Sequence, residues 1–146
     1  MEIKSTAFEN NEKIPSKYTC DGENISPPLS FSNIPENTKS LVLICEDPDA
    51  PNGTWIHWTV WNIDPSTTEV PENEIPTNGS EGMTSFGFRR YGGPCPPSGE
   101  HRYFFKLFAL DSTINLDTGC NSVDLYISMD GRILDQAELV GKYTKI

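Results

Sequence analysis

Three side chains in this sequence have the chemistry of a small-molecule site. Asp47 directly follows an apolar run, His57 lies within the aromatic segment Trp55–Ile63, and His101 begins the aromatic run that ends at Leu110. A carboxylate and two imidazoles at strand ends can line a small-molecule pocket, or the three side chains can bind a metal ion. The residues therefore predict a small-molecule site or, as the alternative, a metal-dependent enzyme.

Two loops rich in proline stand beside these side chains. In "DPDAP", Pro48 and Pro51 fix the backbone and remove two N–H donors. In "YGGPCPPSG", Gly92 and Gly93 allow close backbone approach while three prolines stiffen the chain. Rigid loops around a few polar groups are typical of a preorganised ligand pocket.

The first of these loops carries two further predictions. We expect the Ala50–Pro51 peptide bond to be cis, because it lies in a tight loop beside the site. We also expect Asp49 to pair with Arg89 or Arg90, since a partly buried carboxylate needs a partner. Such an ion pair would hold the two loops together.

Other kinds of site fit the sequence less well. "DPDAPNG" resembles a calcium loop, but Pro51 and Asn52 occupy its fifth and sixth positions, where the pattern needs a ligand and a glycine. Ser98 is close to His101 in sequence, yet no G-x-S-x-G motif supports a hydrolase nucleophile. A facial metal triad usually places a histidine and a carboxylate two residues apart, and this chain lacks that spacing at these positions.

The elements that must position the site are mostly strands. Twelve prolines and eleven glycines divide the chain into short segments, which is typical of a β-rich domain. Aromatic and β-branched residues predict the main strands, and residues 64–83 read as a long surface loop. The predicted strands are Leu41–Glu46, Trp55–Ile63 and Arg102–Leu110, with short ones at Thr84–Phe88 and Ile3–Phe8.

Strand alternation predicts which way His57 points. Side chains two residues apart share a face, so His57 groups with Trp55 and Trp61. Trp58 is then expected on the opposite face, in the main core. His57 would look into a second layer or a cavity.

Helices are predicted only in the last third of the chain. Ser122 could cap "VDLYISMD", and residues 132–143 after Gly131 place apolar side chains at helical spacing. We expect two short helices, or one helix interrupted near Gly131. Strands followed by helices predict a mostly β, α+β fold.

Length and charge narrow the class of protein. A chain of 146 residues is expected to form a single domain, residues 1–146. Its net charge of −10 argues against nucleic acid or an anionic membrane surface as a partner. No apolar run approaches the roughly 18 residues of a membrane span, and the first residues show no secretion signal. The expected location is therefore cytoplasmic.

The four cysteines give no metal or redox motif. Cys20, Cys45, Cys95 and Cys120 form no C-x-x-C pair. Cys45 lies in an apolar run and is expected to be buried. Whether Cys20 and Cys120 pair stays open at this point.

Several longer segments resemble one known family. "DPDAP", "WIHWTVWNI" and "GGPCPPSGEHRYFFKLFAL" occur in the order of the signature segments of the phosphatidylethanolamine-binding protein family, which includes Raf kinase inhibitor protein. "YTCDGENISPPLSF" and "DGRILDQAELVGKY" are similar to its bacterial and archaeal branch. The likeness covers nearly the whole chain.

The resemblance implies a fold and a site. The fold would be a β-sandwich with a large antiparallel sheet, a smaller sheet and short C-terminal helices. An anion pocket at one end would receive phosphate, acetate or a phosphoryl headgroup. The residues that match the family's ligand-binding positions are Asp47, His57, Gly93, Pro94, His101 and Tyr103.

The resemblance also implies a function without catalysis. Relatives are linked to inhibition of protein kinases or serine proteases, so a regulatory role toward a partner enzyme is expected, with no cofactor. Bacterial relatives suggest a homodimer. One departure concerns the pocket: many relatives have a second proline after Gly-Pro, where this chain has Cys95. A thiol is therefore expected near the pocket mouth.

Overall fold

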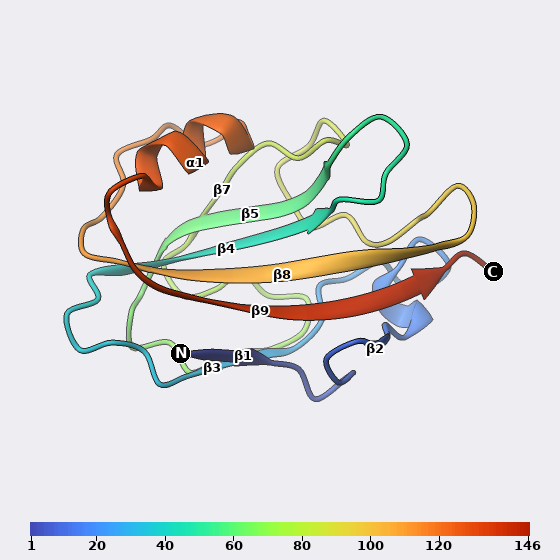
Figure 1. The fold of residues 1–146 in the computed structure, drawn as a ribbon, viewed down its shortest axis with the longest axis horizontal. Helices are drawn as coiled ribbons and strands as arrows, with labels where there is room; N and C mark the ends of the chain where they lie inside the picture. The colour runs from blue at the N-terminus through green and yellow to red at the C-terminus, as the bar shows by residue number, and fades with distance from the viewer.

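The computed structural model describes residues 1–146 as a sandwich of two sheets with one helix on the outside (Figure 1). The larger sheet has six strands in the order β2-β9-β8-β4-β5-β7, and the smaller has the order β1-β3-β6. All pairings are antiparallel except the short parallel pairing of β2 with β9. The elements are β1 (Glu2–Lys4), β2 (Glu12–Lys13), the 3-10 turn η1 (Ser16–Tyr18), β3 (Leu29–Ser32), β4 (Ser40–Asp47), β5 (Trp55–Ile63), β6 (Glu69–Val70), β7 (Ser80–Glu81), β8 (Glu100–Leu110), α1 (Ser122–Met129) and β9 (Ile133–Thr144).

Two hydrophobic cores lie on the two faces of the large sheet. The larger core joins residues of both sheets, including Phe31 of β3, Leu43 of β4 and Phe105 of β8. The smaller core packs Leu125 and Met129 of α1 against the other face of the large sheet. Because both faces are covered, every residue of β4 is buried.

The main predicted strands are confirmed. Trp55–Ile63 is a strand with the predicted bounds, and the other two long strands differ from the prediction by one or two residues at their ends. Of the two predicted short strands, one is absent and the other is shorter than expected. Thr84–Phe88 is a turn closed by the backbone N–H and hydroxyl of Thr84, which both donate to the Phe88 carbonyl. The first strand covers only Glu2–Lys4.

The first predicted helix is confirmed and the second is wrong. Helix α1 starts one residue earlier than expected, because Asn121 rather than Ser122 provides the cap by accepting a hydrogen bond from the Asp124 N–H. Residues Ile133–Thr144 form strand β9, which pairs with β8 along its length. The fold therefore has one C-terminal helix.

The alternation along β9 explains why it is a strand. Leu139 and Tyr143 face the larger core. Between them, a side chain at Gly141 would meet those of Ile14 and Phe8. Apolar residues at odd positions thus meet the core with a period of two, although the spacing of other apolar residues also fits a helix. Pairing with β8 decides the conformation over local propensity.

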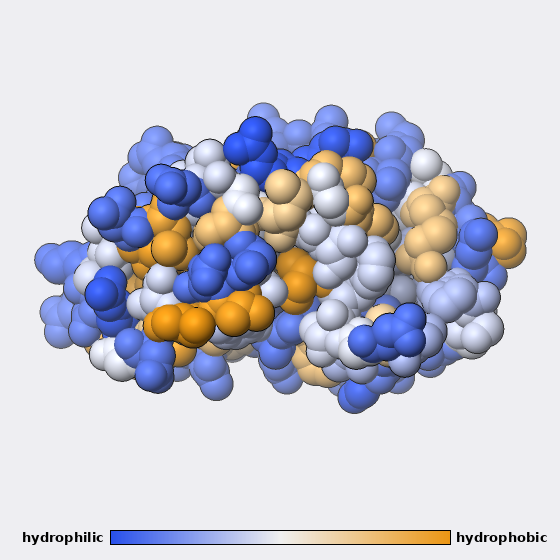
Figure 2. All heavy atoms as spheres, turned by 90° about the horizontal axis from the view of Figure 1, so that it is seen from above, coloured by the Kyte–Doolittle hydropathy of each residue, from blue (hydrophilic) through white to orange (hydrophobic).

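The outer surface mixes apolar and hydrophilic side chains. Figure 2 shows the molecule from above, with apolar patches between hydrophilic groups. On α1, Val123 and Ile127 are exposed on the side away from the smaller core. None of the helices has the length and apolar character needed to cross a membrane.

Candidate functional site

Strand β4 ends, and β5 and β8 begin, at the same end of the sandwich (Figure 1). A cavity of about 220 Å³ opens there. The sheet register brings the site residues together there, because Asp47 pairs with Trp55 and Glu46 pairs with Phe104. The cavity is lined by Asp47, Ala50, Pro51, Trp55, His57, Phe86, Cys95, Pro96, Pro97, His101 and Tyr103. Four of the six predicted ligand-binding residues therefore meet in one cavity.

A β-bulge sets the direction of His57. Trp58 pairs with Cys45 and Ile56 pairs with Glu46, so His57 is left without a partner on β4. The extra residue interrupts the alternation. His57 then contacts the ring of Tyr103, with centroids 5.2 Å apart, on the side of the sheet where Trp58 is buried.

The predicted separation of His57 from Trp58 is therefore wrong. The prediction grouped His57 with Trp61, which lies in the smaller core on the other side of the large sheet. His57 shares the Trp58 side and reaches the cavity at its end. His57 does line a cavity, one of the two alternatives that were predicted, but on the side of the sheet opposite to the one expected.

His57 is buried and fixed by one backbone group. Its Nδ1 lies 2.6 Å from the carbonyl oxygen of Gly92, and only 3% of the residue is exposed. A carbonyl can only accept, so Nδ1 carries the hydrogen. Burial lowers the pKa of His57 below its usual value of 6.5, which favours the neutral ring. Nε2 is left without a protein partner.

His101 is held by Asp47. Its Nδ1 lies 2.6 Å from Oδ2 of Asp47, and both residues are buried. The other oxygen of Asp47, Oδ1, accepts from the backbone N–H of Asp49 at 2.7 Å. Because both carboxylate oxygens have donors within the protein, Asp47 orients His101. The Nε2 atom of His101, like that of His57, has no protein partner.

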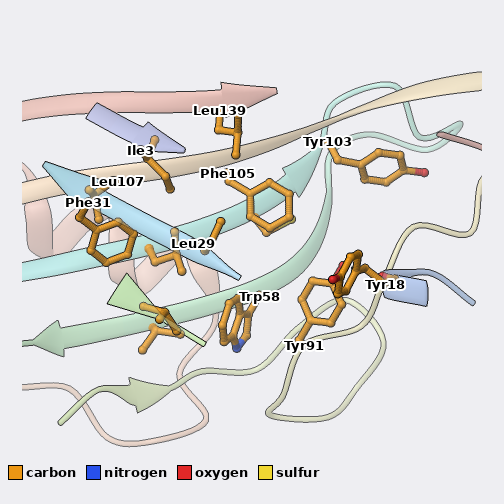
Figure 3. Close-up of a cluster of buried hydrophobic side chains, with 14 of the residues drawn as sticks. Ile3, Tyr18, Leu29, Phe31, Trp58, Tyr91, Tyr103, Phe105, Leu107 and Leu139 are labelled. Atoms are coloured by element: carbon orange, nitrogen blue, oxygen red, sulfur yellow. The ribbon is translucent and has the colours of Figure 1, made fainter. Parts of the chain in front are cut away.

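Tyr103 is the most deeply buried of the four predicted residues that line the cavity. Figure 3 shows its ring at one end of the larger core, pointing away from Phe105. The hydroxyl is buried and has no hydrogen-bond partner in the protein. Burial raises the pKa of Tyr103 well above its usual value, so the hydroxyl stays protonated and can donate. An unpaired buried hydroxyl is costly unless a ligand or water satisfies it.

The glycine-proline loop forms the wall differently from the prediction. Cys95, Pro96 and Pro97 line the cavity, whereas Gly93 and Pro94 do not. Gly93 and Pro94 instead attach the loop to the segment 18–24 near the N-terminus. The attachment consists of hydrogen bonds from Gly93 N to Asn24 Oδ1 (2.8 Å), from Cys20 N to the Pro94 carbonyl (3.1 Å) and from the Tyr91 hydroxyl to the Tyr18 carbonyl (2.8 Å).

The loop and segment 18–24 approach so closely that position 93 must be a glycine. A side chain on Gly93 would collide with the Tyr18 carbonyl oxygen and with Asn24. A disulfide between Cys20 and Cys95 completes the attachment. The open question about Cys20 is thereby answered, because its partner is Cys95, while Cys120 is free.

An ion pair between Asp49 and Arg102 supports the loop between β4 and β5. Asp49 accepts from the backbone N–H of Arg102 at 2.9 Å, and the Arg102 guanidinium donates to both Asp49 oxygens at 2.8 and 2.9 Å. The predicted pairing with Arg89 or Arg90 is wrong: Arg89 donates to Thr118, and Arg90 stacks on an aromatic ring. Arg102 could not be chosen from spacing, because the register of β8 on β4 brings it there.

The predicted cis peptide bond is also wrong. The chain has no cis peptide bonds, so Ala50–Pro51 is trans. The loop from β4 to β5 makes its turn with a Gly53 N–H to Ala50 carbonyl hydrogen bond, and Gly53 has φ of 107°. The conformational freedom of glycine at that position allows the turn without a cis bond.

Sequence reasoning did not find the apolar rim of the cavity. Trp55 and Phe86 are 39% and 37% exposed and meet edge to face at 5.5 Å. Phe86 also contacts His57, with centroids 5.2 Å apart. Their type gave no distinct signal, since aromatic residues are frequent in strands and cores. The cavity thus has polar groups inside and aromatic rings at its mouth.

The cavity does not have the layout of a metal centre. No group of three or more His, Cys, Asp or Glu side chains is placed to bind a metal ion. His57 and His101 contribute Nε2 atoms, but both oxygens of Asp47 already accept hydrogen bonds. The geometry gives the alternative of a metal-dependent enzyme less support than anion binding.

Fold and cavity together define a β-sandwich protein with a ligand-sized site at one end. The family model of phosphatidylethanolamine-binding protein matches residues 4–144. The chain therefore belongs to the phosphatidylethanolamine-binding protein family, as its motifs predict.

Relatives and solved structures agree with this assignment. A UPF0098 protein of Methanothermobacter thermautotrophicus is 47% identical, over 99% of both chains. The crystal structure of the phosphatidylethanolamine-binding protein homologue CT736 from Chlamydia trachomatis superimposes with a TM-score of 0.95 at 43% identity, covering 99% of this chain and 97% of that one. Escherichia coli YbcL, described as a member of the mammalian family, gives 0.92 at 32% identity, with 99% and 98% covered.

Proposed function

We propose that the protein binds a small anion, such as phosphate, acetate or a phosphoryl headgroup, in the cavity between His57 and His101. One observation carries the proposal. Both imidazoles use Nδ1 within the protein, which leaves both Nε2 atoms free in a cavity that also contains the unpaired Tyr103 hydroxyl. Three hydrogen-bonding groups without partners are thus available to one ligand.

The protonation of the rings sets the kind of anion that fits. With Nδ1 protonated, a neutral ring presents a lone pair at Nε2, whereas a protonated ring presents an N–H and a positive charge. A fully ionised anion is therefore bound best when at least one ring is protonated, and His57, whose pKa is lowered by burial, is the ring expected to take up a proton on binding. A ligand with its own O–H, such as a singly protonated phosphate, can instead donate to a neutral ring.

Calorimetric titration with sulfate and with phosphoethanolamine tests the proposal. His57→Ala and His101→Ala should each weaken binding by about 1.5–3 kcal/mol, the range for hydrogen bonds to charged groups. Gln136→Ala, at an exposed position on β9, is the matched control and should bind as the wild type does. Wild-type affinity in both histidine variants would reject this site.

Sulfate keeps two negative charges between pH 8 and 5.5, so its affinity reports the protein's protons alone. We expect the affinity to rise as pH falls through this window, because binding takes up a proton. Titrations in buffers of different ionisation enthalpy measure that uptake directly. An affinity that stays flat across the window, with no proton taken up, would show that the anion does not bind to His57.

We extend the proposal to regulation of a partner enzyme, a protein kinase or a serine protease. Membership of the family and the exposed aromatic rings at the cavity mouth support this step. The test is an inhibition assay against enzymes of both classes, with and without saturating sulfate. Trp55→Ala should reduce any inhibition, while Val123→Ala on α1 should not.

Two further predictions from the sequence accompany the proposal. The homodimer can be tested by light scattering of the purified protein across a range of concentrations. The cytoplasmic location can be tested by cell fractionation.

A further inference from the structure

The segment Cys95–Gly99 forms the outer lip of the cavity and has few attachments. Cys95, Pro96 and Pro97 line the cavity, but no residue from 95 to 99 takes part in a hydrogen bond with the rest of the chain. The hydrogen bonds of the loop end at Pro94, and pairing with β9 resumes at Glu100. Apart from the packing of buried Pro96, the disulfide is what fixes this lip.

The disulfide is accessible to a reductant. Cys20 and Cys95 are both exposed, although Cys95 also lines the cavity. The free cysteines differ, since Cys45 is fully buried and Cys120 packs at the edge of the smaller core. Exposed disulfides are the ones that exchange readily with external thiols. The bond thus combines access from solvent with a position in the cavity wall.

We infer that the Cys20–Cys95 disulfide is a redox site through which a dithiol reductant weakens anion binding; the inference rests on the proposed function. A thiolate of the reductant attacks one sulfur, the S–S bond breaks, and the other cysteine leaves as a thiolate. The second thiol of the reductant then displaces the first cysteine. The products are two protein thiols and an oxidised reductant, with two electrons and two protons transferred.

Reduction removes the covalent attachment of the lip but not the attachment of Gly93 and Pro94. The hydrogen bonds to Asn24 Oδ1 and from Cys20 N stay available. The lip then gains freedom that ligand binding must remove again, which lowers affinity. The coupling is reciprocal, so bound anion must make the disulfide harder to reduce by the same factor.

Sulfate titration of oxidised and dithiothreitol-reduced protein tests the inference. We expect affinity to fall about fivefold or more on reduction, within the usual range of coupling between sites. Cys20→Ser breaks the bond outside the cavity and should bind as weakly as reduced wild type, with no response to dithiothreitol. Cys120→Ser keeps the disulfide and is the matched control. Alkylation and mass spectrometry identify which cysteines are reduced.

Equal affinity in the oxidised and reduced wild type would overturn the inference. Global unfolding of reduced wild type, seen by circular dichroism, would also overturn it, because the bond would then be a structural staple. If Cys20→Ser alone fails to fold, the comparison of sulfate affinity between oxidised and reduced wild type tests the inference by itself. Protection of the disulfide by saturating sulfate, matching the loss of affinity, supports the inference.

Failure of the proposed function can be distinguished from failure of this inference. If oxidised wild type binds neither sulfate nor phosphoethanolamine, anion binding is rejected, and the redox site is judged without a ligand. The NMR order parameters of Cys95, Ser98 and Gly99 should then fall on reduction from near 0.85 to below about 0.6. Unchanged order parameters would reject the redox site as well.

Discussion

Asp47 and His101 are joined by a 2.6 Å hydrogen bond that uses Nδ1 of the imidazole. The same carboxylate is held from its other side by the backbone N–H of Asp49. Asp47 therefore acts as a fixed acceptor that determines which nitrogen of His101 is free for a ligand. This role explains why a negatively charged side chain lies beside an anion site. Both Asp47 oxygens already accept hydrogen bonds within the protein, so they do not face the ligand as free acceptors.

Asp47→Asn should weaken sulfate binding by about 1–2 kcal/mol, because the amide cannot reproduce a charged hydrogen bond to the ring. An amide N–H facing Nδ1 would also shift the His101 hydrogen to Nε2, which gives sulfate one donor but without the positive charge of a protonated ring. Calorimetry measures the affinity and NMR of the imidazole nitrogens reports the tautomer. Asp64→Asn, at a half-buried position whose carboxylate bonds only Ser66, is the control. An unchanged tautomer and unchanged affinity would contradict the role of Asp47.

Tyr103→Phe should have opposite effects on stability and binding. The hydroxyl has no partner in the protein, so its removal should leave the free energy of unfolding unchanged or raise it. Sulfate affinity should fall by about 1 kcal/mol, because a donor is lost from the cavity. Denaturant unfolding and calorimetry on the same samples measure both. Loss of stability without loss of affinity would show that the hydroxyl serves the fold.

The positions of the site residues follow from the sequence only where local pattern decides. The β5 strand was predictable because aromatic and β-branched residues fill it, and Asp47 stands at the end of an apolar run. His57 shows the limit, since the bulge that turns it depends on how β4 and β5 are paired. Strand β9 shows the same limit, because its partner β8 overrides a pattern that also fits a helix.

Contacts between segments far apart in the sequence could not be predicted from local sequence patterns. Cys20 and Cys95 are 75 residues apart, and four cysteines allow several pairings. Gly93 was expected to approach the ligand, but it is close to the Tyr18 carbonyl instead. The sequence predicted that position 93 needs a glycine because another group approaches it closely. Which group this is, the Tyr18 carbonyl, depends on the tertiary fold.

Gly93→Ala should push the loop away from segment 18–24, because the added methyl collides with the Tyr18 carbonyl and with Asn24. We expect a loss of about 1–3 kcal/mol in the free energy of unfolding, the usual cost of overpacking. Weaker sulfate binding should accompany it. Ser98→Ala, at an exposed position of the same loop, is the control. Wild-type stability in Gly93→Ala would contradict the close packing of the two segments.

Asp49 and Arg102 should show a coupling of about 1 kcal/mol in a double-mutant cycle, since their pair is bidentate but partly exposed. The Arg102 guanidinium lowers the pKa of Asp49 from 3.8 to about 2. The stabilisation is therefore complete above about pH 5 and is lost progressively as pH falls through about 2. Denaturant unfolding of the wild type, Asp49→Ala, Arg102→Ala and the double variant measures it. Additive effects would show that the pair does not hold the loop.

His57 should make the free protein less stable as pH falls from about 6.5 to 5.5. Burial lowers its pKa in the folded state, whereas the unfolded ring keeps a value near 6.5. In this window the unfolded chain binds more protons, so the free energy of unfolding decreases by at most about 1.4 kcal/mol per pH unit. Saturating sulfate should reduce this loss, because it favours the protonated ring. Thermal unfolding of wild type and His57→Gln at several pH values measures the effect, since the glutamine amide can still donate to the Gly92 carbonyl. An equal pH dependence in the two proteins, with or without sulfate, would show that His57 is not the group that titrates.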